Sequence, residues 1–166
     1  MQTHEGCCAM KALRFDRFGQ ADVLHVAELP EPECRAGEFK VRVHAAGLNP
    51  LDWKIRAGHL ARVPRFERPP RGVGVEFAGV IVGVGGGATR HFVGQRVFGA
   101  LPPTGRQGSL AEFVVATGNH LAVIPEGVDF SVTPTVGFRV DIRGLTMNGM
   151  FGSGWTTRMP SSETRK

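Results

Sequence analysis

The first residues in this 166-residue sequence that could do chemistry are the glycines of the stretch GVIVGVGGGATR, residues 79–90. Gly83, Gly85 and Ala88 match the loose pattern G-x-G-x-x-G/A, in which glycines let backbone N–H groups approach the pyrophosphate of a dinucleotide. That chemistry requires a helix directly after the glycines and an acidic residue about 20 residues further on. Neither is found, because glycines and prolines interrupt residues 89–105 and the segment at the required distance, TGRQGS, contains no acid. The sequence therefore favours a turn between two strands over a phosphate-binding loop.

The densest basic patch suggests a second kind of chemistry, the binding of an anion. It consists of Arg62, Arg65, Arg68 and Arg71. Guanidinium groups form paired hydrogen bonds to phosphate and carboxylate groups, so the patch could contact an anionic ligand. Pro64, Pro69 and Pro70 interrupt it, which predicts an irregular loop rather than a helix that enters a DNA groove. A solvated loop and a contact with phosphate or another anion both stay open.

Composition is that of an ordinary globular protein. Hydrophobic residues make up 42% and charged residues 21% of the chain, whose length suits about one domain. The net charge of +5 and the pI near 9.7 raise the question of nucleic acid, but most of the excess is arginine scattered singly among acids and apolar residues. The longest apolar runs are far shorter than the ~20 residues of a membrane helix. We expect neither a nucleic-acid partner nor a membrane span.

The cysteines and the first ten residues carry no signature of metal binding or secretion. Cys7 and Cys8 are adjacent and Cys34 stands alone, so they form neither a disulfide framework nor the C-x-x-C spacing of a zinc or redox site. The N-terminal stretch MQTHEGCCAM has no basic region followed by an apolar core, as a secretory signal would. The expected location is the cytoplasm, with reduced thiols.

Period-two patterns predict a mostly β fold. The predicted strands span residues 10–15, 23–28, 39–45, 76–84, 95–99, 109–117 and 121–124. In the third of them, Phe39 and Val41 fall on one face and Arg42 and His44 on the other, as in a half-buried strand. Frequent Gly and Pro turns and the lack of alternating βαβ units favour an antiparallel, barrel-like domain with one or two short helices.

One short helix is predicted after Gly47. In the stretch NPLDWKIRAGH, Asn49 can cap the helix, Pro50 suits its first position and Gly58 ends it after about two turns. The apolar period changes here from that of a strand, which separates this stretch from the strands on either side.

A resemblance to a known family rests on four stretches, taken in order: MKALRFDRFGQADVLHVAELPEPE, VRVHAAGLNPLDWKIRAGH, GVEFAGVIVGVGGGATRHFVGQRVFGA and GSLAEFVVATGNHLAVIPEGVDFS. Over residues 10–132 the chain resembles the N-terminal part of medium-chain dehydrogenase/reductases, in the zinc-independent quinone oxidoreductase branch. The resemblance implies a GroES-like, partly open β-barrel catalytic domain. This domain is expected to be incomplete, because the Rossmann domain and the returning barrel segment of the family are absent from the sequence. Residues 1–9 are expected to be a disordered extension and residues 133–166 a divergent, disordered tail.

At the metal-binding positions of the zinc-dependent relatives, this sequence has other residues. The resemblance places Asn49 where those relatives carry a catalytic Cys, Leu51 where they carry a proton-relay Ser or Thr, and Val75 where they carry a His. An amide and an isopropyl group cannot replace the thiolate and imidazole of an open zinc site, so no metal is expected. Glu76, which the resemblance retains, is expected to be structural.

The resemblance also implies which residues lie near the cofactor. NADPH is the expected cofactor, and its nicotinamide end would lie beside Asn49. Asn49 and Lys54 are the candidate catalytic residues, while Asn49, Asp52 and Arg56 are the candidates for cofactor binding. An i, i+4 ion pair between Asp52 and Arg56 that only stiffens the turn is the competing interpretation. Trp53 could line a substrate pocket or pack at an edge.

The implied function is that of a catalytic-domain fragment of an NADPH-dependent oxidoreductase acting on a quinone or an α,β-unsaturated carbonyl. Without a cofactor domain the fragment is expected to be inactive alone. The loss of resemblance after about Val132 suggests a truncated or frame-shifted gene product, and the alternative function is a non-enzymatic remnant or interaction module. The expected partner is a small carbonyl or quinone substrate, and a homo-oligomer is compatible with it.

Overall fold

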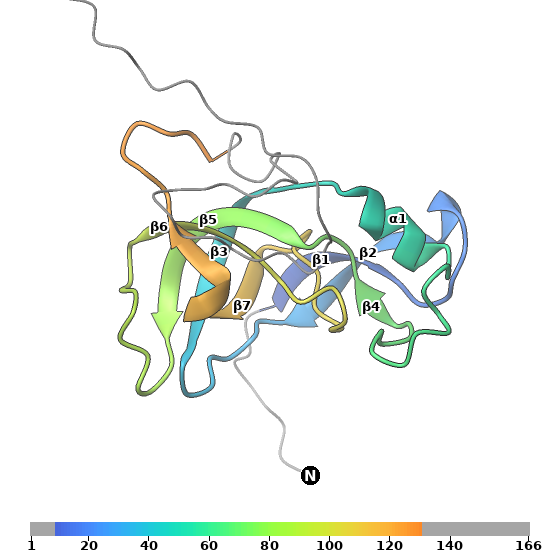
Figure 1. The fold of residues 1–166 in the computed structure, drawn as a ribbon, viewed down its shortest axis with the longest axis horizontal. Helices are drawn as coiled ribbons and strands as arrows, with labels where there is room; N and C mark the ends of the chain where they lie inside the picture. Colours follow the sequence, from blue (N-terminus) through green and yellow to red (C-terminus); the bar gives the residue numbers. More distant parts are fainter. Residues whose placement is uncertain (1–8, 131–166) are drawn as a thin grey trace, which may run out of the picture.

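Two antiparallel sheets make up most of the molecule (Figure 1). A computed structural model describes residues 9–130, so the expected extension and tail lie outside the described residues, except for Ala9, which is already the first residue of a strand. The smaller sheet has the order β2-β1-β4, with β1 at Ala9–Phe15, β2 at Leu24–Pro30 and β4 at Arg71–Gly72. The larger sheet has the order β7-β3-β5-β6-β8, with β3 at Glu38–Ala46, β5 at Glu76–Val84, β6 at Arg96–Ala100, β7 at Phe113–Thr117 and β8 at Leu121–Val123. This curled half-barrel confirms the predicted mostly β, GroES-like fold class.

The central strand β3 follows the predicted alternation. Phe39 and Val41 are buried, whereas Arg42 and His44 are exposed. The buried face belongs to the largest apolar cluster of the described residues, which comprises Phe39, Val41, Phe77, Ile81, Val97, Leu101, Val114, Ala116 and Leu121. Strand β3 lies between β5 and β7 in the sheet, so its two edges are both paired.

The glycine-rich stretch is a turn between two strands, as the sequence favours. Strand β5 ends at Val84 and pairs antiparallel with β6, so the glycines lead into a strand and no helix begins there. Gly85 lies so close to the carbonyl oxygen of Arg35 that a Cβ at this position would collide with it, and Gly87 has a φ of +73°. The glycines are therefore needed for a close backbone approach and a left-handed turn rather than for a ligand.

The two sheets are joined by the segment between Ser109 and Phe113. Leu13 N donates to the oxygen of Leu110 at 2.8 Å, and Val43 N donates to the oxygen of Glu112 at 2.9 Å. The segment thus changes partner from β1 to β3 within a few residues, and regular pairing starts only at Phe113. The predicted strand over 109–117 is therefore too long at its start, because residues 109–112 connect two sheets instead of extending one.

The α-helix α1 (Pro50–Arg56) lies at the same end of the molecule as β4 (Figure 1). Its Ile55 is buried with Phe15, Val23 and Val73 in a second apolar cluster, against which Leu51 also packs. Two short 3-10 helices, Ala21–Val23 and Gly118–His120, complete the described elements. None of the helices over residues 9–130 is long and apolar enough to cross a bilayer.

Candidate functional site

The site predicted from the sequence is built on the first turn of α1, which a capping box begins. Asn49 Oδ1 accepts a hydrogen bond from Leu51 N at 2.9 Å, and Asp52 Oδ2 accepts one from Asn49 N at 2.7 Å. Because these contacts satisfy N–H groups that have no partner within the helix, they fix both the start of the helix and the orientation of the Asn49 side chain. The predicted cap at Asn49 and the predicted Pro50 at the first helical position are confirmed.

The amide nitrogen of Asn49 points to the other wall of the site. Asn49 Nδ2 donates to Glu76 Oε1 at 3.4 Å, and Glu76 is the first residue of β5. A side-chain amide has two N–H donors and this contact uses one of them. Asn49 therefore connects the helix to the sheet and retains one donor for a further hydrogen bond.

Two carboxyl groups and a guanidinium lie partly or fully out of water around this amide. Burial raises the pKa of Asp52 above its ordinary value. Three groups offset part of this rise because they lower the pKa: the N–H of Asn49, the positive charge of Arg71 and the N–H of Gly74. Burial also raises the pKa of Glu76, the hydrogen bond from Asn49 lowers it, and the charge of Asp52 adds to the rise. Burial lowers the pKa of Arg71, while the charges of Asp52 and Glu67 oppose that change. The first turn of α1 is thus a polar cluster within an otherwise apolar end of the fold.

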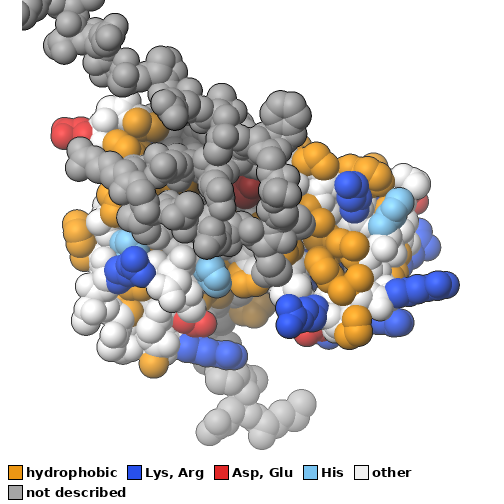
Figure 2. All heavy atoms as spheres, viewed as in Figure 1, with side chains coloured by type: hydrophobic (Ala, Val, Ile, Leu, Met, Phe, Trp, Pro, Cys, Tyr) orange, Lys and Arg blue, Asp and Glu red, His pale blue; other side chains and the backbone are white. Residues whose placement is uncertain are grey.

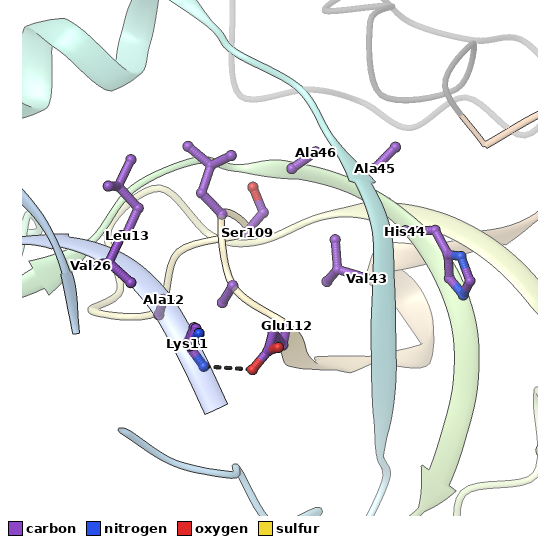
Figure 3. A pocket seen from close by; sticks show the side chains of 12 residues that line it. Lys11, Ala12, Leu13, Val26, Val43, His44, Ala45, Ala46, Ser109 and Glu112 are labelled. Carbon is purple, nitrogen blue, oxygen red and sulfur yellow. Dashed lines mark hydrogen bonds between the residues drawn. The ribbon is translucent and has the colours of Figure 1, made fainter. Parts of the chain in front are cut away.

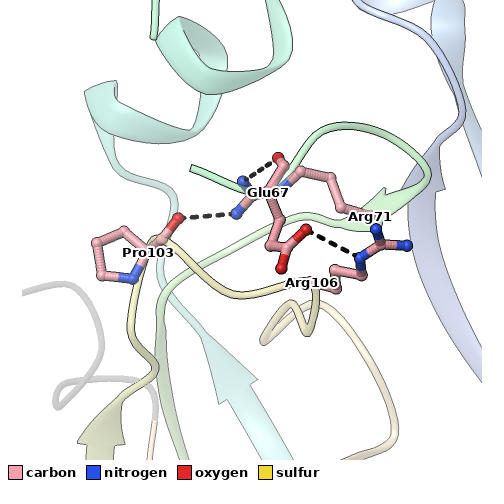
Figure 4. Close-up of polar contacts among 4 residues, drawn as sticks. All are labelled: Glu67, Arg71, Pro103 and Arg106. Carbon is pink, nitrogen blue, oxygen red and sulfur yellow. Dashed lines mark hydrogen bonds and ion pairs between the residues drawn. The ribbon is translucent and has the colours of Figure 1, made fainter. Parts of the chain in front are cut away.

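Arg71 is the residue of this cluster that sequence reasoning missed. Arg71 is 3% exposed. Its Nη1 donates to the backbone carbonyl oxygen of Glu67 at 3.2 Å, and its Nη2 donates to the backbone carbonyl oxygen of Pro103 at 2.9 Å (Figure 4). The carboxylate of Glu67 in turn pairs with Arg106 Nε at 3.2 Å. Arg71 therefore ties two loops together, and its inclusion in a solvated basic patch is wrong. Its partners are distant in the chain, so the local sequence gave no signal of its burial.

The other predicted residues of α1 have separate surroundings. Lys54 is exposed, and its Nζ lies 5.9 Å from the centroid of the Trp53 ring, which is itself 47% exposed. Arg56 Nη1 donates to the Gly19 oxygen at 2.9 Å. The alternative of an ion pair between Asp52 and Arg56 is wrong, because the two side chains have different partners. The structure brings Asn49 and Asp52 together and places Lys54 and Arg56 on other sides of the helix end.

A second hollow lies between the two sheets, away from the predicted residues (Figure 3). It is open, has a volume of about 540 Å³, and is lined by β1, β2, β3 and the junction segment. Its walls include Leu13, Val26, Val43 and the fully buried Ser109, whose hydroxyl has no hydrogen-bond partner among the described residues. None of the predicted site residues Asn49, Asp52, Lys54 and Arg56 lines this hollow.

The two residues that the resemblance places at zinc-ligand positions, Asn49 and Val75, carry neither a thiolate nor an imidazole. Asn49 Oδ1 is occupied by a backbone N–H and Nδ2 is a donor, while the side chain of Val75 has no ligand atom. Over residues 9–130, no group of three or more His, Cys, Asp and Glu side chains is placed to hold a metal ion.

A family model and several known proteins are similar to this chain. Residues 35–126, more than half of the chain, match the model of the alcohol dehydrogenase GroES-like domain. The quinone oxidoreductase of Pongo abelii is 33% identical over 129 residues, which are 77% of this chain and 37% of that protein. The chain belongs to the medium-chain dehydrogenase/reductase superfamily. Within this superfamily it falls in the quinone oxidoreductase-like branch.

Other members of the superfamily are similar to the same part of the chain. The enoyl reductase component of the lovastatin nonaketide synthase from Aspergillus terreus is 33% identical over 122 residues, or 71% of this chain and 32% of that protein. A mycobacterial protein solved in complex with NADPH matches with a TM-score of 0.63 and 29% identity, over 75% of this chain and 35% of the other. The chain therefore spans about a third of the length of these superfamily members.

Proposed function

We propose that this chain supplies the GroES-like, substrate-facing part of a zinc-independent, NADPH-dependent oxidoreductase that reduces a quinone or an α,β-unsaturated carbonyl. The observation that carries the proposal is the Asn49 amide, which is held between α1 and Glu76 with one donor unused, at a position where the resemblance implies a metal ligand in zinc-dependent relatives. The names of two relatives, a quinone oxidoreductase and an enoyl reductase component, support the substrate class. The NADPH complex of a structural neighbour supports the cofactor.

In this proposal the cofactor supplies the hydride, and the chain supplies hydrogen-bond donors for the substrate. The remaining N–H of Asn49 is the donor available to a carbonyl oxygen that gains negative charge during reduction, and a catalytic role of Lys54, which lies on another side of the helix end, stays a prediction. Donors that are fixed before the reaction stabilise such charge best, and the capping box and Glu76 fix Asn49 in this way. The direct roles of Asp52 and Arg56 in cofactor binding stay predictions, since both side chains make internal hydrogen bonds.

A chimera tests the proposal. Residues 10–130 would replace the aligned segment of the Pongo abelii quinone oxidoreductase, and NADPH oxidation with a soluble benzoquinone would be followed by absorbance. We expect the chimera to oxidise NADPH without added zinc, and the 166-residue chain alone to show no turnover. Circular dichroism and thermal melting establish that the chimera is folded, so a folded chimera without activity would contradict the proposal and favour an interaction module.

Two variants of the chimera separate catalysis from helix capping. Asn49→Ser keeps an oxygen that can cap the helix but removes the amide donor, so we expect a loss of roughly 10²-fold in kcat/KM with little change in melting temperature. Asn119→Ala changes an exposed asparagine on a 3-10 helix and serves as the matched control. Full activity of the Asn49→Ser chimera would show that the amide has no role in the reaction.

A further inference from the structure

The hollow between the two sheets is an apolar surface that the proposed function does not use. Its volume is about 540 Å³, and its walls come from β1, β2, β3 and the junction segment. Leu13 and Val26, which are partners across β1 and β2, lie in one wall, and Val43 of β3 lies in the opposite one (Figure 3). Val26 is 67% exposed. An open apolar wall of this kind marks a surface that another segment or molecule covers.

Exposed apolar side chains at the other end of the molecule have a different setting. At the end that carries α1, they lie among Lys and Arg side chains (Figure 2). Apolar side chains scattered among charges are normal on a protein surface and need no cover. In the hollow, the charged Lys11 and Glu112 lie together, since Lys11 N donates to the Glu112 carboxylate at 2.6 Å. The rest of its lining is mainly apolar, so the hollow is the surface for which we sought an occupant.

The wall that contains Val26 belongs to an edge strand. In the sheet order β2-β1-β4, strand β2 lies at the edge and pairs with β1. An edge strand is a template for a further strand because its outer backbone N–H and C=O groups face away from the sheet. The edge of β7 is covered by a side chain, since Gln107 Nε2 donates to the Val115 oxygen at 2.8 Å and Val115 N donates to Gln107 Oε1 at 3.0 Å. A strand added beside β2 would also bury apolar side chains in the hollow.

The described part of the chain ends at the rim of this hollow. The ring of Phe130 stacks on the ring of His44, with 4.6 Å between centroids and an interplanar angle of 17°. His44 belongs to the lining of the hollow on the β3 side. Phe130 also lies under the guanidinium of Arg96, whose Cζ is 4.4 Å from the ring centroid. These contacts fix the point from which the chain continues, and that point adjoins the hollow.

The sequence beyond this point contains a stretch with the pattern of a strand. Residues 136–142 lie outside the described residues, and every second one of them is apolar: Val136, Phe138, Val140 and Ile142. The residues that alternate with them are Gly137, Arg139, Asp141 and Arg143. Such alternation, flanked here by Pro134 and Gly144, is typical of a half-buried strand.

The length and position of this stretch suit the edge of β2. Residues 136–142 are seven in number, as are the residues of β2 (Leu24–Pro30). Val136 follows Phe130 by six residues, and six extended residues span at most about 20 Å. Because Phe130 already lies at the rim of the hollow, the linker can place the stretch there without disturbing the described fold.

We propose that residues 136–142 of this chain pair with the edge of β2 and place Phe138, Val140 and Ile142 in the hollow. The polar residues that alternate with them then face solvent. The chain would thus cover its own half-barrel with a segment of its tail. This inference involves neither cofactor nor substrate and goes beyond the proposed function. It competes with the expected disordered tail over residues 133–166, and exchange experiments decide between the two.

Amide hydrogen exchange of the 166-residue chain, followed by mass spectrometry of peptides, tests the docking. We expect the amides of residues 136–142 to exchange at least about tenfold more slowly than those of a synthetic peptide of the same sequence. The triple variant Phe138→Ser, Val140→Ser, Ile142→Ser should lose this protection and speed exchange in β2. The matched variant Arg139→Ser, Asp141→Ser, Arg143→Ser should retain it, because these residues face solvent. Exchange of the wild type at the rate of the peptide, or equal losses in both variants, would overturn the inference.

A second pair of variants locates the docking surface. Val26→Asp places a charge in the wall of the hollow, whereas Val123→Asp places one on β8, and both valines are exposed. We expect Val26→Asp to abolish the protection of residues 136–142 and Val123→Asp to change it by less than about twofold. Circular dichroism establishes that both variants are folded. Equal protection in the two folded variants would place the segment outside the hollow and overturn the inference.

Dilution distinguishes docking within one chain from docking between two copies. Protection within one chain should be unchanged when the protein is diluted about a hundredfold, because no association is involved. Protection that is lost on dilution would assign the hollow to the tail of a second copy and overturn the proposal. The chimera proposed above contains residues 10–130 without this segment, so failure of the docking would leave the oxidoreductase proposal standing.

Discussion

The interior of the five-stranded sheet and the interior beside α1 are filled with different kinds of side chain. The largest core cluster in the sheet contains only apolar residues, among them Phe77, Ile81 and Val97, each 0% exposed. Beside α1, Asp52 and Arg71 are 9% and 3% exposed, and the positive charge of Arg71 opposes the rise that burial causes in the pKa of Asp52. Burying a charge is costly unless opposite charges and hydrogen bonds compensate it, whereas burying apolar surface is favourable by itself.

The two regions therefore have different roles: the apolar cluster of the sheet provides stability, and the polar cluster beside α1 fixes the geometry of the candidate site. Apolar packing in the sheet tolerates small changes in position, because dispersion and burial are not directional. Hydrogen bonds around Asn49, Asp52 and Arg71 depend on direction, and they hold the candidate site in one arrangement. Stability and site geometry should therefore respond differently to substitutions in the two regions.

The largest loss of stability is expected from Arg71→Ala. The substitution leaves the Glu67 and Pro103 carbonyls without their donor and Asp52 without its opposite charge, so we expect a loss of about 3–5 kcal/mol in the free energy of unfolding. Urea denaturation followed by circular dichroism measures it. The control is Arg68→Ala, at an exposed position of the same loop, which should change the free energy of unfolding by less than about 0.5 kcal/mol. Equal effects of the two variants would mean that Arg71 is not a structural clamp.

A somewhat smaller loss is expected from Ile81→Ala in the sheet. Its side chain is fully buried in the apolar cluster, and its truncation leaves a cavity that should cost about 3 kcal/mol in urea denaturation. Val123→Ala, at a position that is 46% exposed, is the matched control and should cost far less. Equal losses from Ile81→Ala and Val123→Ala would mean that burial in this cluster does not set the stability of the sheet.

Asn49→Ala probes the first turn of α1 on a finer scale. Removing a helix cap costs about 1 kcal/mol, and Asn49→Ser should restore most of it because a hydroxyl oxygen can also cap. Thermal melting of the two variants under the same conditions provides the comparison. If the serine variant is as unstable as the alanine variant, the contact with Glu76 rather than the cap sustains the local fold.

The smallest effect is a dependence of stability on pH that originates in Glu76. Burial raises its pKa in the folded chain above the ordinary value of 4.5, so the folded state binds the proton more tightly than the unfolded state does. This contribution to stability is present below the unfolded pKa and is lost as the pH rises through the folded pKa. Glu76→Gln should therefore stabilise the chain relative to the wild type above that range, and the gain should vanish near pH 4.

Melting temperatures measured between pH 4 and pH 8 test this, with Glu126→Gln on an exposed turn as the control. A constant difference between Glu76→Gln and the wild type at all pH values would show that the carboxyl does not change its proton affinity on folding.

Local patterns in the sequence were sufficient to predict most strands and the helix of the fold. The alternation of Phe39 and Val41 with Arg42 and His44 identified the central strand, and Asn49 with Pro50 marked the start of α1. The two-residue strand β4 was not predicted, because a pair with Arg14 and Phe15 has no local pattern of its own. The sequence predicts strand at the junction after Ser109 for a related reason, since the partners of residues 109–112 are set by the two sheets rather than by their own pattern.

The candidate site was less accessible to sequence reasoning than the fold. The capping role of Asn49 follows from its neighbours, but the burial of Arg71 depends on Pro103, 32 residues away. Arg68 and Arg71 both belong to the arginines spaced three residues apart, yet Arg68 is exposed whereas Arg71 is buried. The contacts of Arg71 with the Glu67 and Pro103 carbonyls distinguish the two residues.

The junction that joins the sheets also has a consequence for synthesis on the ribosome. Lys11 N donates to the carboxylate of Glu112 at 2.6 Å across 101 residues of chain, and Ala12 bridges to Ala111. At ~5–20 residues per second, β1 waits on the order of 5–20 s for this partner. Until then it has the hairpin with β2 and, once residues 71–72 are made, the two-residue pairing with β4, and such small sheets are marginally stable in water. The nascent N-terminal strands are thus the part of this domain with the longest exposure to chaperones.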